Sequence, residues 1–497
     1  MFTALEMLLR QRLMIACALG LVSSAAMGTQ PAPCQVPGIA HQVLCGSVQR
    51  PLDPLHPGYS SIAIHYAIVP ALARNKHPDP VLLLAGGPGQ SAISLAPAVL
   101  PLLSRLNNRR DLIFVDQRGT GRSAPLECEP DDGRPLGERF DTAAQRRSLA
   151  ACRHTLAGLP FLKSERDLRF FTTTIAMGDI DAVRRELGID RVNLIGASYG
   201  SRAALELLRI YPLSVRRTVL DGVAPPDMAL PDSMSIDSQR VLEAVFSSCL
   251  REALCALTFP HLRADWDGLL ASLPRTVDLR DPRSGRIDRL RIDRDTLLGM
   301  VRGPLYLPAA ASVLPAAISD AANGRFEPLA ALATMLQPRP GRQHSDGVAA
   351  GMHFSVVCSE DVPLLDSGHA VAGRDFGTSM REQYRKICAD WPLGSVERAY
   401  YSVPPSPSPV LMFSGGLDPA TPQRHGEDVR RRLGPKASHR VIANAGHGLL
   451  SIGCVRDVVF RFIDATSEDG ALAIDSRCAE AIPRPPAFLP PIASAPR

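Results

Sequence analysis

The 497-residue sequence lacks several features that would mark large classes of protein. Beyond residue 28, no stretch reaches the roughly 18 uninterrupted apolar residues that a membrane-spanning helix needs. No internal repeat and no nucleic-acid-binding motif is visible, and no cysteines have the CxxC or Cys/His spacing of a zinc site. The sequence therefore argues against a membrane-spanning, repeat-built or nucleic-acid-binding protein, and we expect no structural metal.

A strong excess of charge of either sign is also missing, since the formal net charge is only +5. The segment 283–295, "RSGRIDRLRIDRD", alternates arginines with aspartates, which predicts a solvated face rather than a nucleic-acid patch. The hydrophobic fraction of 45% and the charged fraction of 21% are typical of a folded, soluble chain. The length indicates one large domain with an inserted subdomain, or two to three domains.

The N-terminus has the pattern of a signal peptide. Arg10 and Arg12 precede an apolar run, 13–28, that ends in small residues, and Ala26-Met27-Gly28 is a plausible cleavage site. An N-terminal membrane anchor is the alternative. We expect residues 1–28 to be removed and the mature protein to be periplasmic or secreted, without stable insertion in a membrane.

Removal of this segment leaves ten of the eleven cysteines. An even number in an exported chain favours disulfide bonds, although the sequence alone does not fix their connectivity. Pairing of nearest neighbours is the simplest arrangement, because each pair then closes a short local loop. The expected pairs are 34–45, 128–152, 249–255, 358–388 and 454–478.

Apolar strand patterns alternate with helical patterns in two parts of the chain. Such alternation predicts a parallel sheet that is covered by helices on both faces. The strand patterns lie at 61–71, 80–89, 111–123, 191–200, 215–226, 409–422 and 438–448, and helical patterns at 172–189, 201–212 and 454–464.

Between these two parts only helical patterns are visible, and a proline-rich connector at 402–409 precedes the return to strands. We therefore predict a sheet domain that is interrupted by a helical cap. The expected segments are 29–226 for the first part of the core, 227–402 for the cap, 403–480 for the second part of the core, and 481–497 for a proline-rich, loosely ordered tail.

The segment 193–205, "NLIGASYGSRAAL", places Ser198 between two glycines where a strand turns into a helix. The pentapeptide Gly196–Gly200 fits the G-x-S-x-G motif, in which a strained turn lifts the serine hydroxyl above the sheet. The N-terminus of the following helix places backbone N–H groups beside that hydroxyl. Ser198 is therefore the predicted nucleophile, and a purely structural turn is the alternative.

A serine hydroxyl needs a base to take its proton, and the base needs a carboxylate to orient it. On this fold the chain order is serine, acid, histidine. His447, in the glycine turn "NAGHGLL" after a late strand, is the predicted base. Asp418 is the favoured acid and Asp221 the alternative, whereas we expect Asp116 to brace a turn beside the site.

The tetrahedral intermediate of acyl transfer also needs two N–H donors for its oxyanion. We expect the backbone of Tyr199, the residue after the nucleophile, to supply one of them. The other should come from Gly87, in the "AGGPG" loop that follows an early strand. A plain tight turn is the alternative interpretation of that loop.

Five motifs occur in a characteristic order: "GGPGQS", "DQRGTGRS", "GASYG", "GGLDPATP" and "GHG". This order resembles the α/β-hydrolase family of prolyl aminopeptidases, and more closely its exported branch of tripeptidyl-aminopeptidase-like proteins with a TAP-like C-terminal region. "VVCSED" (356–361) and "CADWP" (388–392) resemble the late cap of that branch, and the likeness covers roughly 40–480. Ala85 stands where many prolyl aminopeptidases have histidine, so a narrow preference for proline is not implied.

The resemblance implies an α/β-hydrolase fold with an inserted helical cap, and release of N-terminal residues from short peptides through an acyl-enzyme without a cofactor. Relatives hold the free amino group of the substrate with acidic cap residues, for which Glu360, Asp361 and Glu243 are candidates here; each could instead be a surface carboxylate. A carboxylic-ester or amide hydrolase with the same residues is a second interpretation. A catalytically silent binding protein is a third, against which the complete set of Ser198, Asp418 and His447 argues.

Overall fold

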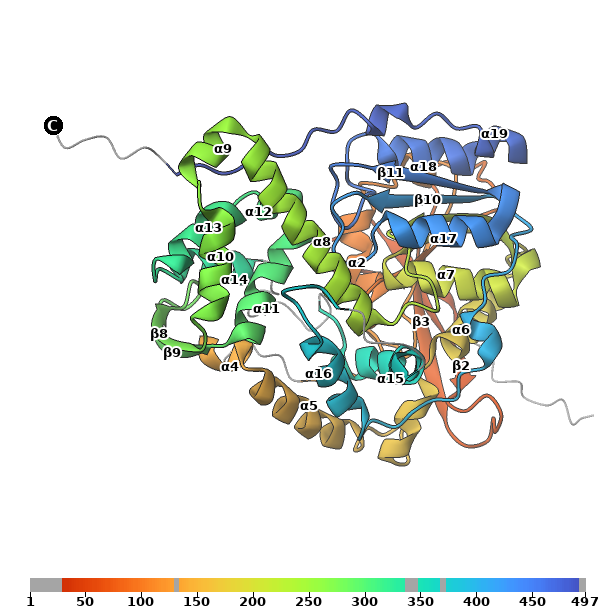
Figure 1. Cartoon of the computed structure of the whole chain (residues 1–497). Helices are drawn as coiled ribbons and strands as arrows, with labels where there is room; N and C mark the ends of the chain where they lie inside the picture. Colours follow the sequence, from red (N-terminus) through yellow and green to blue (C-terminus); the bar gives the residue numbers. More distant parts are fainter. Residues whose placement is uncertain (1–28, 129–133, 336–346, 367–371, 491–497) are drawn as a thin grey trace, which may run out of the picture.

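The computed structural model describes residues 29–128, 134–335, 347–366 and 372–490 (Figure 1). The predicted signal peptide, 1–28, and the last seven residues of the predicted tail, 491–497, lie outside the described residues. In the part of the chain that is described, no helix is long and apolar enough to cross a lipid bilayer.

A mixed sheet of nine strands forms the core of the described chain. The strands at 81–84, 112–115, 192–197 and 215–221 consist mainly of apolar residues and are almost completely buried, as the sequence predicted. In the order in which they lie side by side, the strands are β1 (Thr29–Cys34), β2 (Val43–Pro51), β3 (Ser61–Val69), β5 (Leu112–Val115), β4 (Val81–Leu84), β6 (Val192–Ala197), β7 (Val215–Asp221), β10 (Val410–Gly415) and β11 (Ala437–Ile442).

The six strands from β5 to β11 in this order are parallel, and β1, β2 and β3 add antiparallel pairs at one edge. The carboxyl ends of parallel strands meet at the same edge of a sheet. The loops that follow β4, β6, β7, β10 and β11 therefore converge, although the strands are far apart in the sequence. These loops carry the predicted oxyanion glycine, nucleophile, acid and base.

Helices cover both faces of the sheet, as the sequence predicted (Figure 1). On one face, α6 (Thr173–Glu186), α7 (Tyr199–Ile210) and α17 (Gln423–Leu433) pack in one hydrophobic cluster. On the other face, α2 (Ala92–Val99) and α18 (Val455–Asp464) pack in a second cluster. This arrangement confirms the predicted α/β-hydrolase class.

A third hydrophobic cluster holds the cap, which lies to the side of the sheet in Figure 1. Its core contains the fully buried side chains of Trp266 and Phe326. The helices that contribute to this cluster are α8 (Leu230–Arg251), α9 (Ala253–Thr258), α10 (Leu262–Ala271), α11 (Arg294–Leu305), α12 (Pro308–Ala311), α13 (Leu314–Ala322) and α14 (Glu327–Met335). Helices α15 (Ala350–Glu360) and α16 (Ser379–Cys388) complete the cap below them, and their buried apolar residues join the first cluster, beside α6 and α7.

The expectation that 227–402 contains only helices is wrong. Strands β8 (Arg275–Arg280) and β9 (Ile287–Ile292) form an antiparallel hairpin there. In β9, Leu290 and Ile292 are buried while Arg289 and Arg291 are exposed, so the charged residues alternate with apolar ones at the period of a strand. The short helix α4 (Leu136–Phe140), which precedes residue 227, packs against β9.

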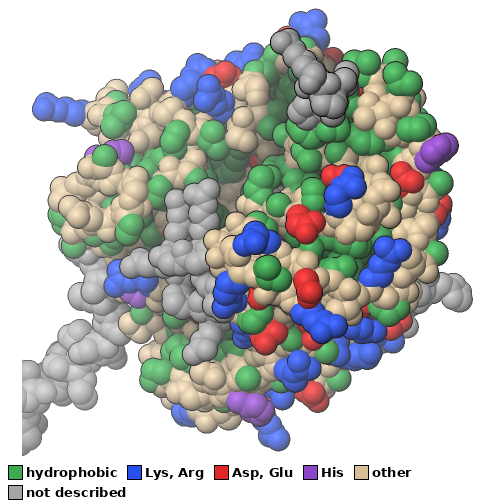
Figure 2. All heavy atoms as spheres, turned by 90° about the vertical axis from the view of Figure 1, so that its left-hand side faces the viewer, with side chains coloured by type: hydrophobic (Ala, Val, Ile, Leu, Met, Phe, Trp, Pro, Cys, Tyr) green, Lys and Arg blue, Asp and Glu red, His purple; other side chains and the backbone are tan. Residues whose placement is uncertain are grey.

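The charged residues of this hairpin lie on a solvated face, as the alternation of arginine and aspartate predicted. The guanidinium of Arg286 lies 3.9 Å from the carboxylate of Asp288, and that of Arg291 lies 3.8 Å from Asp293. Figure 2 shows the side of the molecule that carries the cap, where basic and acidic side chains are interspersed. The solvated Arg291–Asp293 pair contributes little to stability, whereas the carboxylate of Asp288 is mostly buried and also accepts the N–H of Leu136 at 2.7 Å.

All five disulfides expected from the cysteine spacing are present: Cys34–Cys45, Cys128–Cys152, Cys249–Cys255, Cys358–Cys388 and Cys454–Cys478. The bond between Cys358 and Cys388 joins α15 to the end of α16. Trp391 follows that end and donates a hydrogen bond of 3.1 Å from Nε1 to Ser355 Oγ on α15. The two helices are therefore connected twice.

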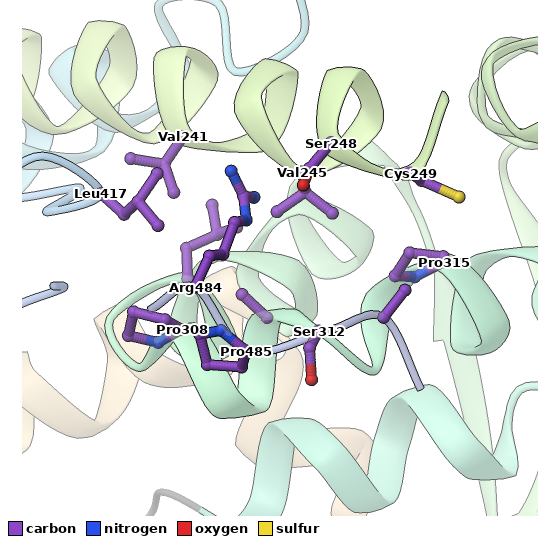
Figure 3. A pocket seen from close by; sticks show the side chains of 13 residues that line it. Val241, Val245, Ser248, Cys249, Pro308, Ser312, Pro315, Leu417, Arg484 and Pro485 are labelled. Carbon is purple, nitrogen blue, oxygen red and sulfur yellow. The ribbon is translucent and has the colours of Figure 1, made fainter. Parts of the chain in front are cut away.

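The expectation of a loosely ordered tail is wrong for residues 481–490. Arg484 donates to the carbonyl of Ala244 at 3.1 Å, and the N–H of Phe488 donates to Ser312 at 2.9 Å. Figure 3 shows Arg484 and Pro485 between α8 and the segment that carries Ser312. This proline-rich segment therefore packs across the cap. Its prolines supply apolar surface and restrict the backbone.

We predict that the disulfides differ in their contribution according to the loop that each one closes. Loop-closure entropy assigns about 3–4 kcal/mol to a bond that spans 30 residues, as Cys358–Cys388 does. It assigns about 2 kcal/mol to the six-residue span of Cys249–Cys255. Replacing each pair by alanine and measuring the free energy of unfolding in urea should give the larger loss for Cys358–Cys388. Equal losses would contradict the loop-entropy account.

Candidate active site

Ser198 occupies the sharp turn between β6 and α7. Its φ of 56° lies in a region that residues other than glycine rarely adopt. The N–H of Ser198 donates to the carbonyl of Asp221 at 2.9 Å, which holds the turn against β7. A Cβ atom at Gly196 would lie 2.2 Å from the oxygen of Gly200, and one at Gly200 would lie 2.0 Å from the oxygen of Leu84. Both glycines are therefore required by close backbone packing.

His447 follows β11, and its imidazole meets Asp418 from the loop after β10. The distance from His447 Nδ1 to Asp418 Oδ2 is 2.9 Å. The cap also supports this histidine. The backbone N–H of His447 donates to the carbonyl of Tyr306 at 3.0 Å, and the ring of Tyr306 packs edge-on against the imidazole. The structure thus brings together the predicted base and the favoured acid.

The carboxylate of Asp418 is fully buried and held by several donors. The N–H groups of Ala420 and Thr421 donate to Oδ1 at 2.8 and 2.9 Å, and Thr421 Oγ1 donates to Oδ2 at 2.8 Å. Burial favours the neutral acid, but the charge and hydrogen bond of His447 and these N–H groups outweigh it and lower the pKa of Asp418 to about 2. Conversely, burial disfavours the imidazolium, but Asp418 outweighs it and raises the pKa of His447.

Asp221, the alternative acid, has a different set of partners. Its carboxylate accepts the N–H groups of Leu449 at 2.8 Å and of Leu450 at 2.9 Å. Asp221 therefore supports the loop behind His447 and does not contact its ring nitrogen. Burial, opposed by these two N–H groups, raises the pKa of Asp221.

Asp116 braces the neighbouring turns, as the sequence predicted. Its carboxylate accepts the hydroxyl of Ser91 at 2.6 Å and the N–H of Ile93 at 3.1 Å, both at the start of α2. It also accepts the N–H of Arg122 at 3.2 Å. The loop after β4 and the loop after β5 are thereby fixed to each other.

The two predicted oxyanion donors lie at the same cavity as Ser198. Tyr199 is the first residue of α7, and Gly87 adopts a φ of +109° in the loop after β4. A Cβ atom at Gly86 would lie 3.2 Å from that of Ser198, so this loop passes directly beside the nucleophile. Within the described chain, the backbone N–H groups of Gly87 and Tyr199 donate to no protein acceptor. They are therefore free to bind an oxyanion.

The cavity has a volume of about 240 Å³ and lies between the core and the cap. Thr421 and Tyr306, which both contact His447, line the same cavity as Ser198. The cap contributes residues from four helices. These are Leu230 and Met234 of α8, Arg302 of α11, His353 and Val357 of α15, and Tyr384 of α16.

The three cap carboxylates that were candidates for binding an amino group are not equivalent. Asp361 lines the cavity, but its two oxygens lie 2.8 and 3.1 Å from the guanidinium of Arg202. Glu360 does not line it and instead accepts the N–H and hydroxyl of Thr173 and the hydroxyl of Tyr400. Burial outweighs the effects of Arg202 and Tyr400 and raises the pKa of Glu360 to about 7.

Glu243, the third candidate, lies outside this cavity. Its carboxylate accepts the side-chain amide of Gln239 at 2.8 Å and pairs with Arg263. That one of these carboxylates binds a substrate amino group stays a prediction: Asp361 lines the cavity but is paired with arginine, Glu360 is buried in a hydrogen-bond network, and Glu243 lies elsewhere. Arg202 lies 159 residues before Asp361, so nothing in the local sequence indicated the pairing.

His353 is a cavity residue that the sequence analysis missed. Its Nε2 lies 3.0 Å from the hydroxyl of Tyr384, and the ring also bonds to the carbonyl of Pro88, next to the oxyanion loop. Burial lowers the pKa of His353 to about 4, so the ring is neutral. His353, Val357 and Asp361 recur at intervals of four residues, and this helical spacing before "VVCSED" was the available signal.

Residues 79–452 match the sequence model of the family described as "alpha/beta hydrolase fold". Serine protease Hip1 of Mycobacterium tuberculosis (strain ATCC 25618 / H37Rv) is 28% identical over 433 residues, which cover 80% of each chain. Carboxylesterase B of the same strain is 27% identical over 439 residues, which cover 78% of each chain. Tripeptidyl aminopeptidase of Streptomyces lividans is 29% identical over 196 residues, which cover 37% of this chain and 36% of that one.

The family match extends over most of the chain, and its boundaries include the serine turn, the buried aspartate and the histidine loop. The strand order and the helices on both faces of the sheet agree with it. The chain therefore belongs to the α/β-hydrolase fold family.

Proposed function

We propose that the chain is an exported serine exopeptidase that releases N-terminal residues from short peptides through an acyl-enzyme. The observation that carries the proposal is the hydrogen bond of 2.9 Å between His447 and Asp418, beside a cavity that Ser198 and two free N–H groups line. A nucleophile, an oriented base and an oxyanion site are the three parts that acyl transfer needs. A binding protein would need none of them.

In the proposed reaction, His447 takes the proton of the Ser198 hydroxyl while the serine oxygen attacks the scissile carbonyl. The negative charge that forms on the carbonyl oxygen is bound by the N–H groups of Gly87 and Tyr199. His447 then gives the proton to the leaving amine, which departs. Water then attacks the acyl-enzyme while His447 takes one of its protons, and His447 returns that proton to the Ser198 oxygen as the acid leaves.

The size of the cavity and its place beneath the cap support short substrates. A cavity of about 240 Å³ beneath the cap admits a few residues of a peptide and excludes a folded protein. The relatives named serine protease and tripeptidyl aminopeptidase support a peptidase. The five disulfides support export, because such bonds persist in oxidising compartments.

Hydrolysis of carboxylic esters is the second candidate function. It is favoured by the relative named carboxylesterase B and by the pairing of Asp361 with Arg202, which leaves that carboxylate without a free charge for a substrate ammonium. The deciding experiment compares fluorogenic amides of one, two and three amino acids with simple esters. Cleavage of an unblocked peptide amide, and failure on the same amide with an acetylated N-terminus, supports the exopeptidase; cleavage of esters alone overturns it.

We predict that Ser198 and His447 act as one unit. Ser198→Ala and His447→Ala should each lower kcat by roughly 10⁴- to 10⁶-fold, and the double variant should lose little more. The melting temperature of the serine variant should change little, because only a hydroxyl at a cavity is removed. Losses that multiply in the double variant would show that the two residues act independently.

We predict that Asp418→Asn lowers kcat by about 10⁴-fold, because an amide favours the wrong tautomer of His447. The residual activity should also shift with pH. The base must be neutral, and Asp418 raises the pKa of His447, so activity in the native enzyme should rise with pH through a midpoint above 6.5. Removing the negative charge should move that midpoint to lower pH.

Asp221→Asn is the matched control for this prediction. Its side-chain oxygen still accepts an N–H group of the loop behind His447, so kcat should fall far less. The midpoint should move less than in Asp418→Asn, because Asp221 contributes less than Asp418 to the raised pKa of His447. A larger loss in Asp221→Asn than in Asp418→Asn, measured as kcat/KM against pH, would reassign the acid.

A further inference from the structure

Arg302 lines the same cavity as Ser198. It belongs to α11, and Tyr306, which caps the C-terminal end of that helix, follows one turn later, about 6 Å along the axis. Both residues line the cavity of Ser198, and Tyr306 contacts His447 through its ring and its carbonyl. Arg302 therefore precedes by about one helical turn the residue that contacts His447.

The guanidinium of Arg302 has no anionic partner among the residues that the structure describes. Its Nη1 contacts two thioether sulfurs, Met234 Sδ at 3.6 Å and Met380 Sδ at 3.9 Å. Sulfur in a thioether is only a weak acceptor, so neither contact balances a full positive charge. The side chain is also partly buried, which reduces the access of water to it.

The other charged groups around the cavity cancel. Arg202 and Asp361 form a bidentate pair, and the pKa of His353, lowered by burial to about 4, keeps that ring neutral. Burial raises the pKa values of Tyr306 and Tyr384, so both phenols are protonated. Arg302 therefore leaves the cavity with one uncompensated positive charge.

A cation that is partly removed from water gains most from a ligand that supplies the opposite charge. The planar guanidinium matches a carboxylate in geometry and can bind both of its oxygens. We propose that Arg302 binds a carboxylate of the substrate, so that the enzyme prefers peptides or esters that carry a negative charge close to the scissile bond. This inference rests on the proposed function in one respect, namely that the cavity of Ser198 receives the substrate.

Two parts of a substrate could supply the carboxylate. Arg302 also lines a second cavity, together with Arg139 and Phe140 of α4, Asp295 of α11 and Gln383 of α16. Arg302 thus borders two spaces, and its partner could be an acidic side chain in the acyl part or the C-terminal carboxylate of a short leaving peptide. The chemistry of recognition is the same in both cases.

The test uses pairs of substrates that differ only in the carboxylate. One arm compares tripeptidyl amides with glutamate or glutamine at each position. A second arm compares short peptides with a free C-terminal carboxylate or a carboxamide. A third arm compares the 4-nitrophenyl monoester of succinic acid with 4-nitrophenyl butyrate, and needs no peptidase activity.

Arg302→Met removes the charge and keeps an apolar stem next to the two methionines, whereas Arg302→Lys keeps the charge. Arg294→Met is the matched control on the same helix, because Arg294 donates to the carbonyl of Asp375 and does not line the cavity of Ser198. Thermal unfolding of each variant shows whether it is folded. Arg302→Lys also keeps the test informative if Arg302→Met does not fold.

In the native enzyme, kcat/KM should be at least about tenfold higher for the acidic member in one peptide arm and in the ester arm. Arg302→Met should lose this preference, Arg302→Lys should keep part of it, and Arg294→Met should keep all of it. The peptide arm that responds identifies which part of the substrate carries the carboxylate.

Equal rates for both members of every pair in the native enzyme would overturn the role of Arg302, as would an unchanged preference in Arg302→Met. Failure of the proposed function has a different signature. If the chain cleaves no peptide, the peptide arms are silent, but the succinate pair still shows the preference and its dependence on Arg302. If peptides are cleaved without any preference, the peptidase stands and the inference on Arg302 fails.

Discussion

The buried carboxylate of Asp418 is the interaction on which the site depends. Four groups donate to it: two backbone N–H groups, the hydroxyl of Thr421 and the imidazole of His447. A buried charge without such partners would be too costly to keep. Satisfying it fixes the loop after β10, and the loop after β11 must then place its histidine against the same oxygen. Asp221 also fixes that second loop, because its carboxylate accepts the N–H groups of Leu449 and Leu450.

The cap is part of the site as well as its cover. The carbonyl of Tyr306 accepts the N–H of His447, and the N–H of Ala349 donates to the carbonyl of Gly89 beside the oxyanion loop. His353 contacts the carbonyl of Pro88 in that loop. Residues of the cap thus support both the proposed base and the proposed oxyanion loop, and the disulfide between Cys358 and Cys388 connects α15 to α16.

Local signals in the sequence predicted the elements whose partners are close in the chain. The serine turn, the alternation of strands and helices, and the five cysteine pairs are of this kind, and all of them are present in the structure. Hairpin β8–β9 was missed because arginines and aspartates at alternate positions obscured a strand pattern that Leu290 and Ile292 carry. Strand β2 was missed because only a few of its residues are fully buried.

The pairing of charged residues that are far apart in the sequence could not be predicted. Glu360 and Asp361 look like free acidic residues in the sequence, but Arg202, 159 residues before Asp361, neutralises the one that reaches the cavity. Arg302 is the opposite case, a charged residue without a partner of opposite charge among the described residues. Nothing in its local sequence distinguishes it from the other arginines. Which charges are compensated is a property of tertiary structure and cannot be inferred from composition.

The central claim is that Ser198 is a nucleophile activated by His447 and Asp418. Labelling with a fluorophosphonate, followed by mass spectrometry of the intact protein and its peptides, tests it most directly. We predict one adduct per chain on Ser198, no adduct in Ser198→Ala, and labelling slowed by orders of magnitude in His447→Ala. Absence of labelling in the folded native protein, or an adduct on another residue, would contradict the claim.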